Sequence, residues 1–205
     1  MKKRILVVLS MLLGISLQGQ ESFKETAEKY RENHYRSFAS QEDGPITLSD
    51  LKYLDFYKPD QAYVCDCKVI LTPDEKPFQL KTYSNTEKPY QKYAQLECFI
   101  NGQKIQLSAY VSLLYKNHPI YKNRLFIPFM DVTNGEETYG GGRYLDIYKK
   151  DIKEKKVNVD FNKAYNPWCA YSYGYNCPIP PRENHLDIAI KAGEKNYTGE
   201  LKVRQ

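Results

Sequence analysis

The feature that most constrains this fold is an Asn101-Gly102 pair between two segments of alternating polar and apolar side chains. The flanking segments run from Tyr93 to Ile100 and from Gln103 to Leu113. A two-residue hairpin turn requires positive φ at both central residues, and Asn followed by Gly adopts this geometry readily. The sequence therefore predicts an antiparallel hairpin here, with which every other element has to be compatible.

Alternation with a period of two also occurs before and after this hairpin. From Tyr63 onward, Cys65, Cys67 and Val69 fall on one face of a predicted strand. Further strands are predicted at 125–132, 143–148, 156–161, 186–192 and 200–203, with polar connections at 81–88 and 115–123. Seven or eight short strands separated by turn signals favour an antiparallel barrel or sandwich. The 19 tyrosines fit half-buried pleated surfaces, so the fold class is mostly β.

One segment near the N-terminus has helical rather than strand periodicity. Aromatic and apolar residues recur near helical spacing between Ser22 and Ser40. Ser22 with Glu25 three residues later fits a capping box, and Gly44-Pro45 ends the segment. A short helical turn is predicted at 48–54. We therefore expect one N-terminal helix beside the β-rich body.

The first residues have the pattern of a secretory signal peptide. Three basic residues at 2–4 precede an apolar run from Ile5 to Leu17. That run is too short to cross a bilayer comfortably as a mature helix, so no stable membrane span is expected; the alternative is an uncleaved N-terminal anchor. Cleavage near Gly19 would leave a signal peptide at 1–19 and a single β-rich domain at 20–205. The mature protein is expected to be periplasmic or secreted.

The charge of the mature chain gives no reason to expect nucleic-acid binding. The sequence has 30 basic and 25 acidic residues, a net charge of +5. Removal of the three basic residues at 2–4 leaves 27 basic residues and a net charge of +2. The basic run at 153–156 is short and contains Glu154. No basic stripe of the kind that tracks a phosphate backbone remains.

Five cysteines in an exported chain indicate disulfide pairing with one thiol left over. Cys169 and Cys177 bracket a loop that a bridge would staple, and we predict that they pair. Cys65 and Cys67 share a strand face, and Cys98 lies on another strand. Either Cys98 pairs with one of these two, or the thiols are buried and inert. A soft metal such as copper(I) is a further alternative, but zinc-type spacing is absent.

The segment from 139 to 195 carries polar residues that a plain barrel does not need. The candidate ligand-binding residues are Arg143, Asp160, Asn162, Asn166, Glu183 and Asn184. Arg143 follows three glycines, and an arginine can clamp a carboxylate or phosphate through two parallel hydrogen bonds. Arg143 is expected to meet Asp160, Asn162 and Glu183 at one end of the barrel. This arrangement would bind a small polar or anionic ligand, whose identity the sequence does not specify.

Two alternatives use the same segment. In the first, Asp160 or Glu183 is the general base of a hydrolase. In the second, prolines at 167, 178, 180 and 181 stiffen a loop that only closes the barrel. A convergent buried pocket would favour binding or catalysis, whereas polar groups bonded to backbone would favour the structural role. The sequence identifies neither a cofactor nor a catalytic residue.

Four motifs resemble those of an exported bacterial family known only as a domain of unknown function. They are Gly-Gly-Arg-Tyr-Leu-Asp at 141–146, the segment 160–171, Cys-Pro-Ile-Pro-Pro-Arg-Glu-Asn at 177–184 and Ala-Gly-Glu-Lys at 192–195. The resemblance implies a shared fold and a shared site, without an established activity. Members are typically exported proteins or lipoproteins. No cysteine precedes Cys65 here, so lipid attachment at the cleavage point is not expected.

We predict that residues 1 to about 19 are absent from the mature protein, because a signal peptidase cuts after a small residue that follows the apolar run. N-terminal sequencing of protein recovered from the periplasm or the medium measures this. Exported material that begins at Met1 would contradict the prediction.

Overall fold

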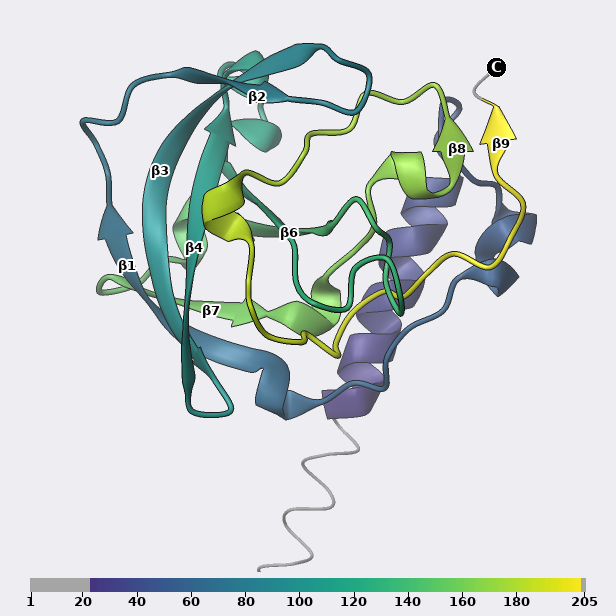
Figure 1. The fold of residues 1–205 in the computed structure, drawn as a ribbon, viewed down its shortest axis with the longest axis horizontal. Helices are drawn as coiled ribbons and strands as arrows, with labels where there is room; N and C mark the ends of the chain where they lie inside the picture. Colours follow the sequence, from purple (N-terminus) through teal and green to yellow (C-terminus); the bar gives the residue numbers. More distant parts are fainter. Residues whose placement is uncertain (1–22, 204–205) are drawn as a thin grey trace, which may run out of the picture.

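The computed structural model describes residues 23–203, and its main element is a curled antiparallel sheet (Figure 1). The sheet contains β1 (Val64–Leu71), β2 (Phe78–Lys81), β3 (Glu87–Ile100), β4 (Gln103–Ser112), β5 (Arg124–Phe129), β6 (Arg143–Tyr148) and β7 (Lys156–Asp160). Six strands follow the order β6-β5-β4-β3-β1-β7, and β2 pairs with β3 outside this path. The sheet forms a half-barrel, which confirms the predicted mostly β class. The signal peptide expected at 1–19 lies outside the described residues.

The predicted hairpin joins the two longest strands of the sheet, β3 and β4. Asn101 has a φ of 50° and Gly102 a φ of 79°, so both adopt the left-handed conformation that the turn requires. A register shift between Lys92 and Ala94 interrupts the ladder. Such a bulge bends a strand. Before it β3 pairs with β2, and after it β3 pairs with β1 on the same edge.

Strand alternation buries one face of the sheet in the main core. On β1, Cys65, Cys67 and Val69 are buried, as the sequence predicts. Leu96, Leu107, Ile127, Leu145 and Val159 extend this core across β3 to β7. Each such side chain contributes about 1.5–3 kcal/mol through burial. A second cluster covers part of the opposite face and consists of Leu80, Tyr90, Tyr110, Phe126 and Tyr144.

The one α-helix among the described residues spans 23–39 and packs beside the sheet (Figure 1). Ala27, Tyr35 and Phe38 are buried, and the last two join a cluster with Tyr171. The predicted helix is therefore present, although the proposed capping residue Ser22 lies outside the described part. No helix within 23–203 is long and apolar enough to cross a membrane.

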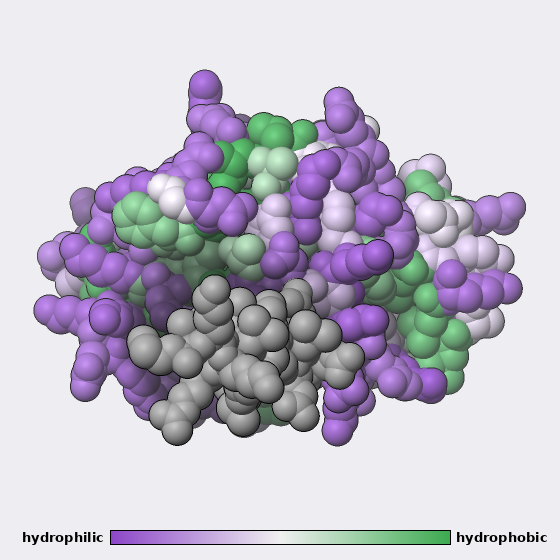
Figure 2. Space-filling model, turned by 90° about the horizontal axis from the view of Figure 1, so that it is seen from below, coloured by the Kyte–Doolittle hydropathy of each residue, from purple (hydrophilic) through white to green (hydrophobic). Residues whose placement is uncertain are grey.

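Short 3₁₀ helices connect the strands. They are η1 (Leu48–Tyr53), η2 (Gln61–Tyr63), η3 (Leu113–Tyr115), η4 (Tyr121–Asn123), η5 (Lys149–Asp151), η6 (Phe161–Lys163), η7 (Trp168–Ala170) and η8 (Arg182–Asn184). The first of them matches the helical turn predicted at 48–54. On the molecular face seen in Figure 2, most of the coloured surface is hydrophilic, with hydrophobic residues in separate patches.

The strand predicted at 186–192 is wrong. This segment is extended, but it joins no regular ladder: Leu186 N donates to Met130 O at 2.8 Å and Val132 N donates to Ile188 O at 3.3 Å. Its Ile190 and Ala192 carbonyls are used by a side chain, as described below, so they are not available to a neighbouring strand. The polar connection predicted at 81–88 is present as the turn between β2, which ends at Lys81, and β3, which begins at Glu87.

The C-terminal strand is shorter than the predicted 200–203. It is β9 (Lys202–Val203), which pairs in parallel with β8 (Ser172–Tyr173) in a separate two-stranded sheet. In Figure 1 this small sheet lies beside the end of the helix.

Four of the five cysteines are placed at disulfide distance in two pairs. Cys67 and Cys98 lie opposite each other on β1 and β3, with Cα atoms 4.3 Å apart. Cys169 and Cys177 have Cα atoms 6.3 Å apart. Cys65 is a buried free thiol. The first pair takes up two of the three thiols that a copper(I) site would need.

We predict that peptide mapping under non-reducing conditions will recover the Cys67–Cys98 and Cys169–Cys177 bridges. By chain entropy, loss of the first should lower the free energy of unfolding by roughly 3–4 kcal/mol and loss of the second by roughly 2–3 kcal/mol, because the first closes a longer loop. Urea unfolding of the Cys→Ser pairs measures both values. A Cys65→Ser variant is the control. A Cys65-containing bridge would contradict the assignment.

Candidate functional site

Arg143, the first predicted site residue, lies at the start of β6 with its guanidinium wholly buried. Its Nη2 donates to Asp131 Oδ2 at 2.7 Å and to Ile190 O at 2.8 Å. Its Nη1 donates to Ala192 O at 2.5 Å and to Glu194 O at 3.2 Å. The arginine is therefore bonded to one carboxylate and three carbonyls of the C-terminal segment, and its side chain has no exposed surface for a ligand.

The partner of Arg143 differs from the prediction. Sequence analysis paired it with Asp160 or Glu183, and the structure pairs it with Asp131, just beyond β5. Asp131 Oδ1 also accepts from Thr133 N at 3.0 Å and from Ile190 N at 3.2 Å. A buried charge is stable only when it is paired and hydrogen-bonded. The ion pair is thus a structural staple.

The triple glycine before Arg143 serves backbone geometry. Gly142 has a φ of +84°, and a Cβ atom there would lie 2.7 Å from both Phe129 O and the Pro180 ring. Only glycine fits such a close approach with positive φ. This supports a structural use of the motif over backbone binding of a ligand.

Glu194, which sequence analysis did not single out, is the second buried charged group of this region. Its carboxylate accepts from Tyr35 O–H at 2.5 Å, from Asn166 N at 2.7 Å and from Tyr171 O–H at 2.7 Å. Burial raises the pKa of Glu194 to about 7, while these hydrogen bonds and Arg143 oppose the rise. The signal available in the sequence was its position in the motif at 192–195.

Asp160 and Asn162 lie together at the end of β7, and neither bonds the Arg143–Asp131 pair. Asp160 caps η6 and accepts from Asn162 N at 3.0 Å. The Asn162 side chain accepts from Asp60 N and donates to Asp60 O, both at 2.8 Å. Lys163 Nζ lies 3.5 Å from Asp160. These groups fix the entry to β1 and leave Asp160 occupied as a cap.

Asn166 and Asn184 also bond to the backbone. Asn166 donates from Nδ2 to Lys195 O at 2.8 Å. Asn184 accepts from Ser108 N at 2.6 Å and donates to Ser108 O at 2.9 Å and Pro128 O at 2.7 Å. It therefore bridges β4 and β5, which pair at a single position.

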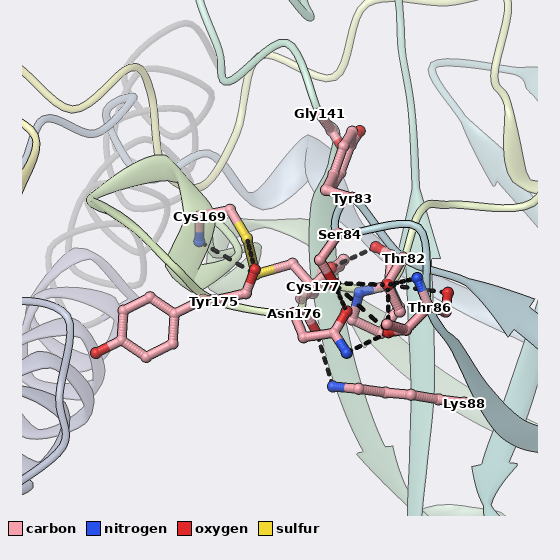
Figure 3. The surroundings of a disulfide bond; sticks show 12 residues. Thr82, Tyr83, Ser84, Thr86, Lys88, Gly141, Cys169, Tyr175, Asn176 and Cys177 are labelled. Carbon is pink, nitrogen blue, oxygen red and sulfur yellow. Dashed lines mark hydrogen bonds between the residues drawn. A yellow bond between two sulfur atoms is a disulfide. The ribbon is translucent and has the colours of Figure 1, made fainter. Parts of the chain in front are cut away.

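The loop closed by Cys169 and Cys177 is anchored to the β2–β3 hairpin. Tyr83 N donates to Cys177 O at 3.1 Å, and Lys88 Nζ donates to Asn176 O at 2.6 Å. Figure 3 shows the disulfide beside a group of hydroxyl side chains from the hairpin turn. The pair therefore holds this loop in place against the β2–β3 hairpin.

Glu183 is the exception among the six predicted residues. Its side chain is 49% exposed, and its carboxylate bonds other side chains rather than backbone. Tyr110 O–H donates to Oε1, and Lys92 Nζ lies 3.4 Å from the same oxygen. Lys92 and Tyr110 face each other on β3 and β4, beside the bulge.

The pKa values of Glu183 and Tyr110 are shifted in opposite directions. Burial alone would raise the pKa of Glu183, but the hydrogen bond from Tyr110 and the charge of Lys92 outweigh it, so that pKa is lowered. Burial and the Glu183 carboxylate raise the pKa of Tyr110 far above its ordinary value. The site therefore presents an ionised carboxylate, an ammonium group and a neutral phenol. A carboxylate with a lowered pKa is a weak general base.

The predicted residues thus form three separate groups. Arg143 and Asn166 surround the segment that ends at Glu194, Asp160 and Asn162 cap η6, and Glu183 with Asn184 lies against β4. The expectation that Arg143 bonds Asp160 or Glu183 is wrong. Within 23–203, no cluster of three or more His, Cys, Asp or Glu side chains is placed to hold a metal ion.

Comparison with known proteins gives a family and a fold. The family model described as "Protein of unknown function (DUF1684)" matches residues 49–195. The solution NMR structure of an uncharacterized protein of Haloarcula marismortui is similar, with a TM-score of 0.66 and 29% sequence identity. The match covers 87% of this chain and 96% of that one. A search of curated proteins gave no significant match.

We predict that Arg143→Ala will lower the free energy of unfolding by about 3–5 kcal/mol, because it leaves Asp131 buried without its cation. Urea denaturation measures the change. Arg182→Ala, at an exposed arginine of the same region, is the control and should stay within about 0.5 kcal/mol of wild type. A wild-type urea midpoint for Arg143→Ala would contradict the staple.

The raised pKa of Glu194 predicts a pH-dependent stability. The folded state holds a proton on Glu194 between its ordinary pKa of 4.5 and about 7, whereas the unfolded state does not. The associated stability is therefore present below pH 4.5 and is lost as pH rises to about 7, by about 3 kcal/mol.

Glu194→Gln removes this titration and imitates the protonated acid. Compared with wild type, it should gain relative stability as pH rises from 4.5 to 7, measured by urea unfolding at a series of pH values. The difference between the two proteins cancels the contributions of other carboxylates. A difference that does not change with pH would rule out a titrating Glu194.

Proposed function

The chain belongs to the DUF1684 family of unknown function, and from that premise we propose that it is an exported domain that binds a small polar ligand at Glu183, Lys92 and Tyr110. One observation carries the proposal. Of the six polar residues predicted for a ligand site, Glu183 alone keeps a half-exposed side chain that is held by other side chains. The other five bond the scaffold, and the two of their atoms that lack a partner among residues 23–203, Arg143 Nε and Asn166 Oδ1, are buried.

Export is supported by the N-terminal pattern and by the cysteines. Two pairs at disulfide distance suit an oxidising compartment, since disulfides persist in the periplasm and outside the cell. The basic and apolar sequence at 2–17 has the layout of a targeting signal. The protein would then meet its ligand in the periplasm or the medium.

The three side chains offer complementary chemistry. Glu183 accepts hydrogen bonds from hydroxyl or ammonium groups, and Lys92 donates to oxygen atoms. A ligand held by these three groups therefore carries both donors and acceptors.

Binding fits the charges better than hydrolysis does. The hydrolase alternative needs a carboxylate that takes a proton near neutral pH. Asp160 is used as a helix cap, and the pKa of Glu183 is lowered by Tyr110 and Lys92 against the effect of burial. A carboxylate whose pKa is lowered instead suits recognition of a donor group.

We predict that native mass spectrometry of the exported protein will detect a retained small molecule. Glu183→Gln should reduce its occupancy at least tenfold, because an amide is a weaker acceptor than a carboxylate. Glu87→Gln is the matched control, since Glu87 is an exposed glutamate on the same strand as Lys92. Its occupancy should equal that of wild type.

Thermal unfolding of both variants checks that they remain folded. A wild-type protein that carries no small molecule would contradict the proposal. So would a folded Glu183→Gln protein with wild-type occupancy.

A further inference from the structure

A second polar cluster lies on β4, β5, β6 and the connection between β4 and β5. We call Ser112, Tyr115, Tyr121, Arg124 and Asp146 the Arg124 cluster. The pairing of Tyr110 with Phe126 places Ser112 beside Arg124 across β4 and β5, and Asp146 faces Phe126 across β5 and β6. Strand register therefore brings Ser112, Arg124 and Asp146 onto one face of the sheet.

The guanidinium of Arg124 is oriented but not saturated. It lies over the rings of Tyr115 and Tyr121, with its Cζ atom 5.8 Å and 5.0 Å from their centroids. Its Nη1 lies 3.6 Å from Asp146 Oδ2, which is an ion pair and too long for a hydrogen bond. Among the described residues, no acceptor takes a hydrogen bond from this guanidinium. Its side chain is 25% exposed, so its donors remain available.

Two buried polar atoms beside Arg124 lack partners. Ser112 Oγ and Asp146 Oδ1 make no hydrogen bond to any described residue. The other Asp146 oxygen is occupied, because Tyr165 O–H donates to Oδ2 at 2.9 Å. Buried polar atoms in native proteins are nearly always hydrogen-bonded, so an orphaned acceptor beside a free donor calls for an explanation.

We propose that the Arg124 cluster is a binding site for a small α-amino or α-hydroxy acid. Arg124 would hold the carboxylate through two of its free donors. Asp146 Oδ1 would accept from the adjacent ammonium or hydroxyl group, and Ser112 Oγ would bond the remaining oxygen. The ligand thus supplies one acceptor and one donor on neighbouring atoms, in the order in which Arg124 and Asp146 require them.

The charge and the exposed surface of the cluster further restrict which ligands can bind. Asp146 lies within an ion-pair distance of Arg124, so a multiply charged anion such as phosphate is repelled by its carboxylate. Tyr115 and Tyr121 are 38% and 40% exposed, and Ile120, which lies between them in the sequence, is 64% exposed. This apolar surface favours an acid whose side chain is aromatic or aliphatic.

The Arg124 cluster is distinct from the proposed Glu183 site. Phe126 is buried between Tyr110, which bonds Glu183, and Asp146. A substitution at one site therefore leaves the other site intact, and each proposal can be tested without the other.

Isothermal titration calorimetry of the full exported protein tests the proposal with four probes. L-phenylalanine and L-phenyllactate carry both groups, 3-phenylpropionate lacks the α donor, and inorganic phosphate is an anion alone. L-phenylalanine or L-phenyllactate should bind saturably. 3-Phenylpropionate and phosphate should bind at least tenfold more weakly. Failure of both L-phenylalanine and L-phenyllactate to bind would overturn the proposal. Equal binding of 3-phenylpropionate would do so as well, because Asp146 would then have no part in recognition.

Variants assign the binding to these residues. Arg124→Lys keeps the charge but loses the planar pair of donors, and it should weaken binding at least tenfold. Asp146→Asn should remove the preference over 3-phenylpropionate, and it serves as the second variant if Arg124→Lys does not fold. Glu87→Gln, at an exposed glutamate of β3, is the control and should bind the acids as wild type does. Unchanged binding in both folded Arg124→Lys and Asp146→Asn would overturn the assignment.

Discussion

The buried ion pair between Arg143 and Asp131 is the interaction on which the rest of this structure depends. A guanidinium without exposure to water needs an acceptor for its donors, because an unpaired buried charge is strongly unfavourable. Here one carboxylate and the carbonyls of Ile190, Ala192 and Glu194 accept from its two Nη atoms, and Nε has no acceptor among the described residues. The C-terminal segment is thereby fixed against the start of β6, and its own side chains Ile190 and Ala192 complete the core.

The same segment connects the helix to the sheet. The Glu194 carbonyl accepts from Arg143. Its carboxylate accepts from Tyr35 of the helix and from Tyr171 in the loop between Cys169 and Cys177. The family match begins at residue 49, after the helix. The helix over 23–39 lies before the matched region, yet its Tyr35 bonds a carboxylate inside that region. Asp131, Glu194 and Arg143, all buried, thus connect the helix, the sheet and the C-terminal segment.

This arrangement separates the polar residues of the chain by their environment. Residues that bond backbone in the interior, such as Asn184 between β4 and β5, stabilise the half-barrel and offer nothing to a ligand. Other polar residues, such as Glu183 on η8 and Arg124 on β5, keep side-chain partners and solvent access. A polar motif in the sequence therefore marks either role, and burial decides between them.

Local signals in the sequence determined the hairpin at Asn101-Gly102, the alternation of β1 and the N-terminal helix, because φ preference and periodicity act over a few residues. They also singled out the polar segment 139–195, but they paired Arg143 with the wrong acid and predicted a strand at 186–192. Only the tertiary structure decided that Asp131 and three carbonyls surround Arg143. Every residue has a carbonyl, so a backbone acceptor has no signature in the sequence. Which carbonyls meet a buried arginine is fixed by packing between segments about 50 residues apart.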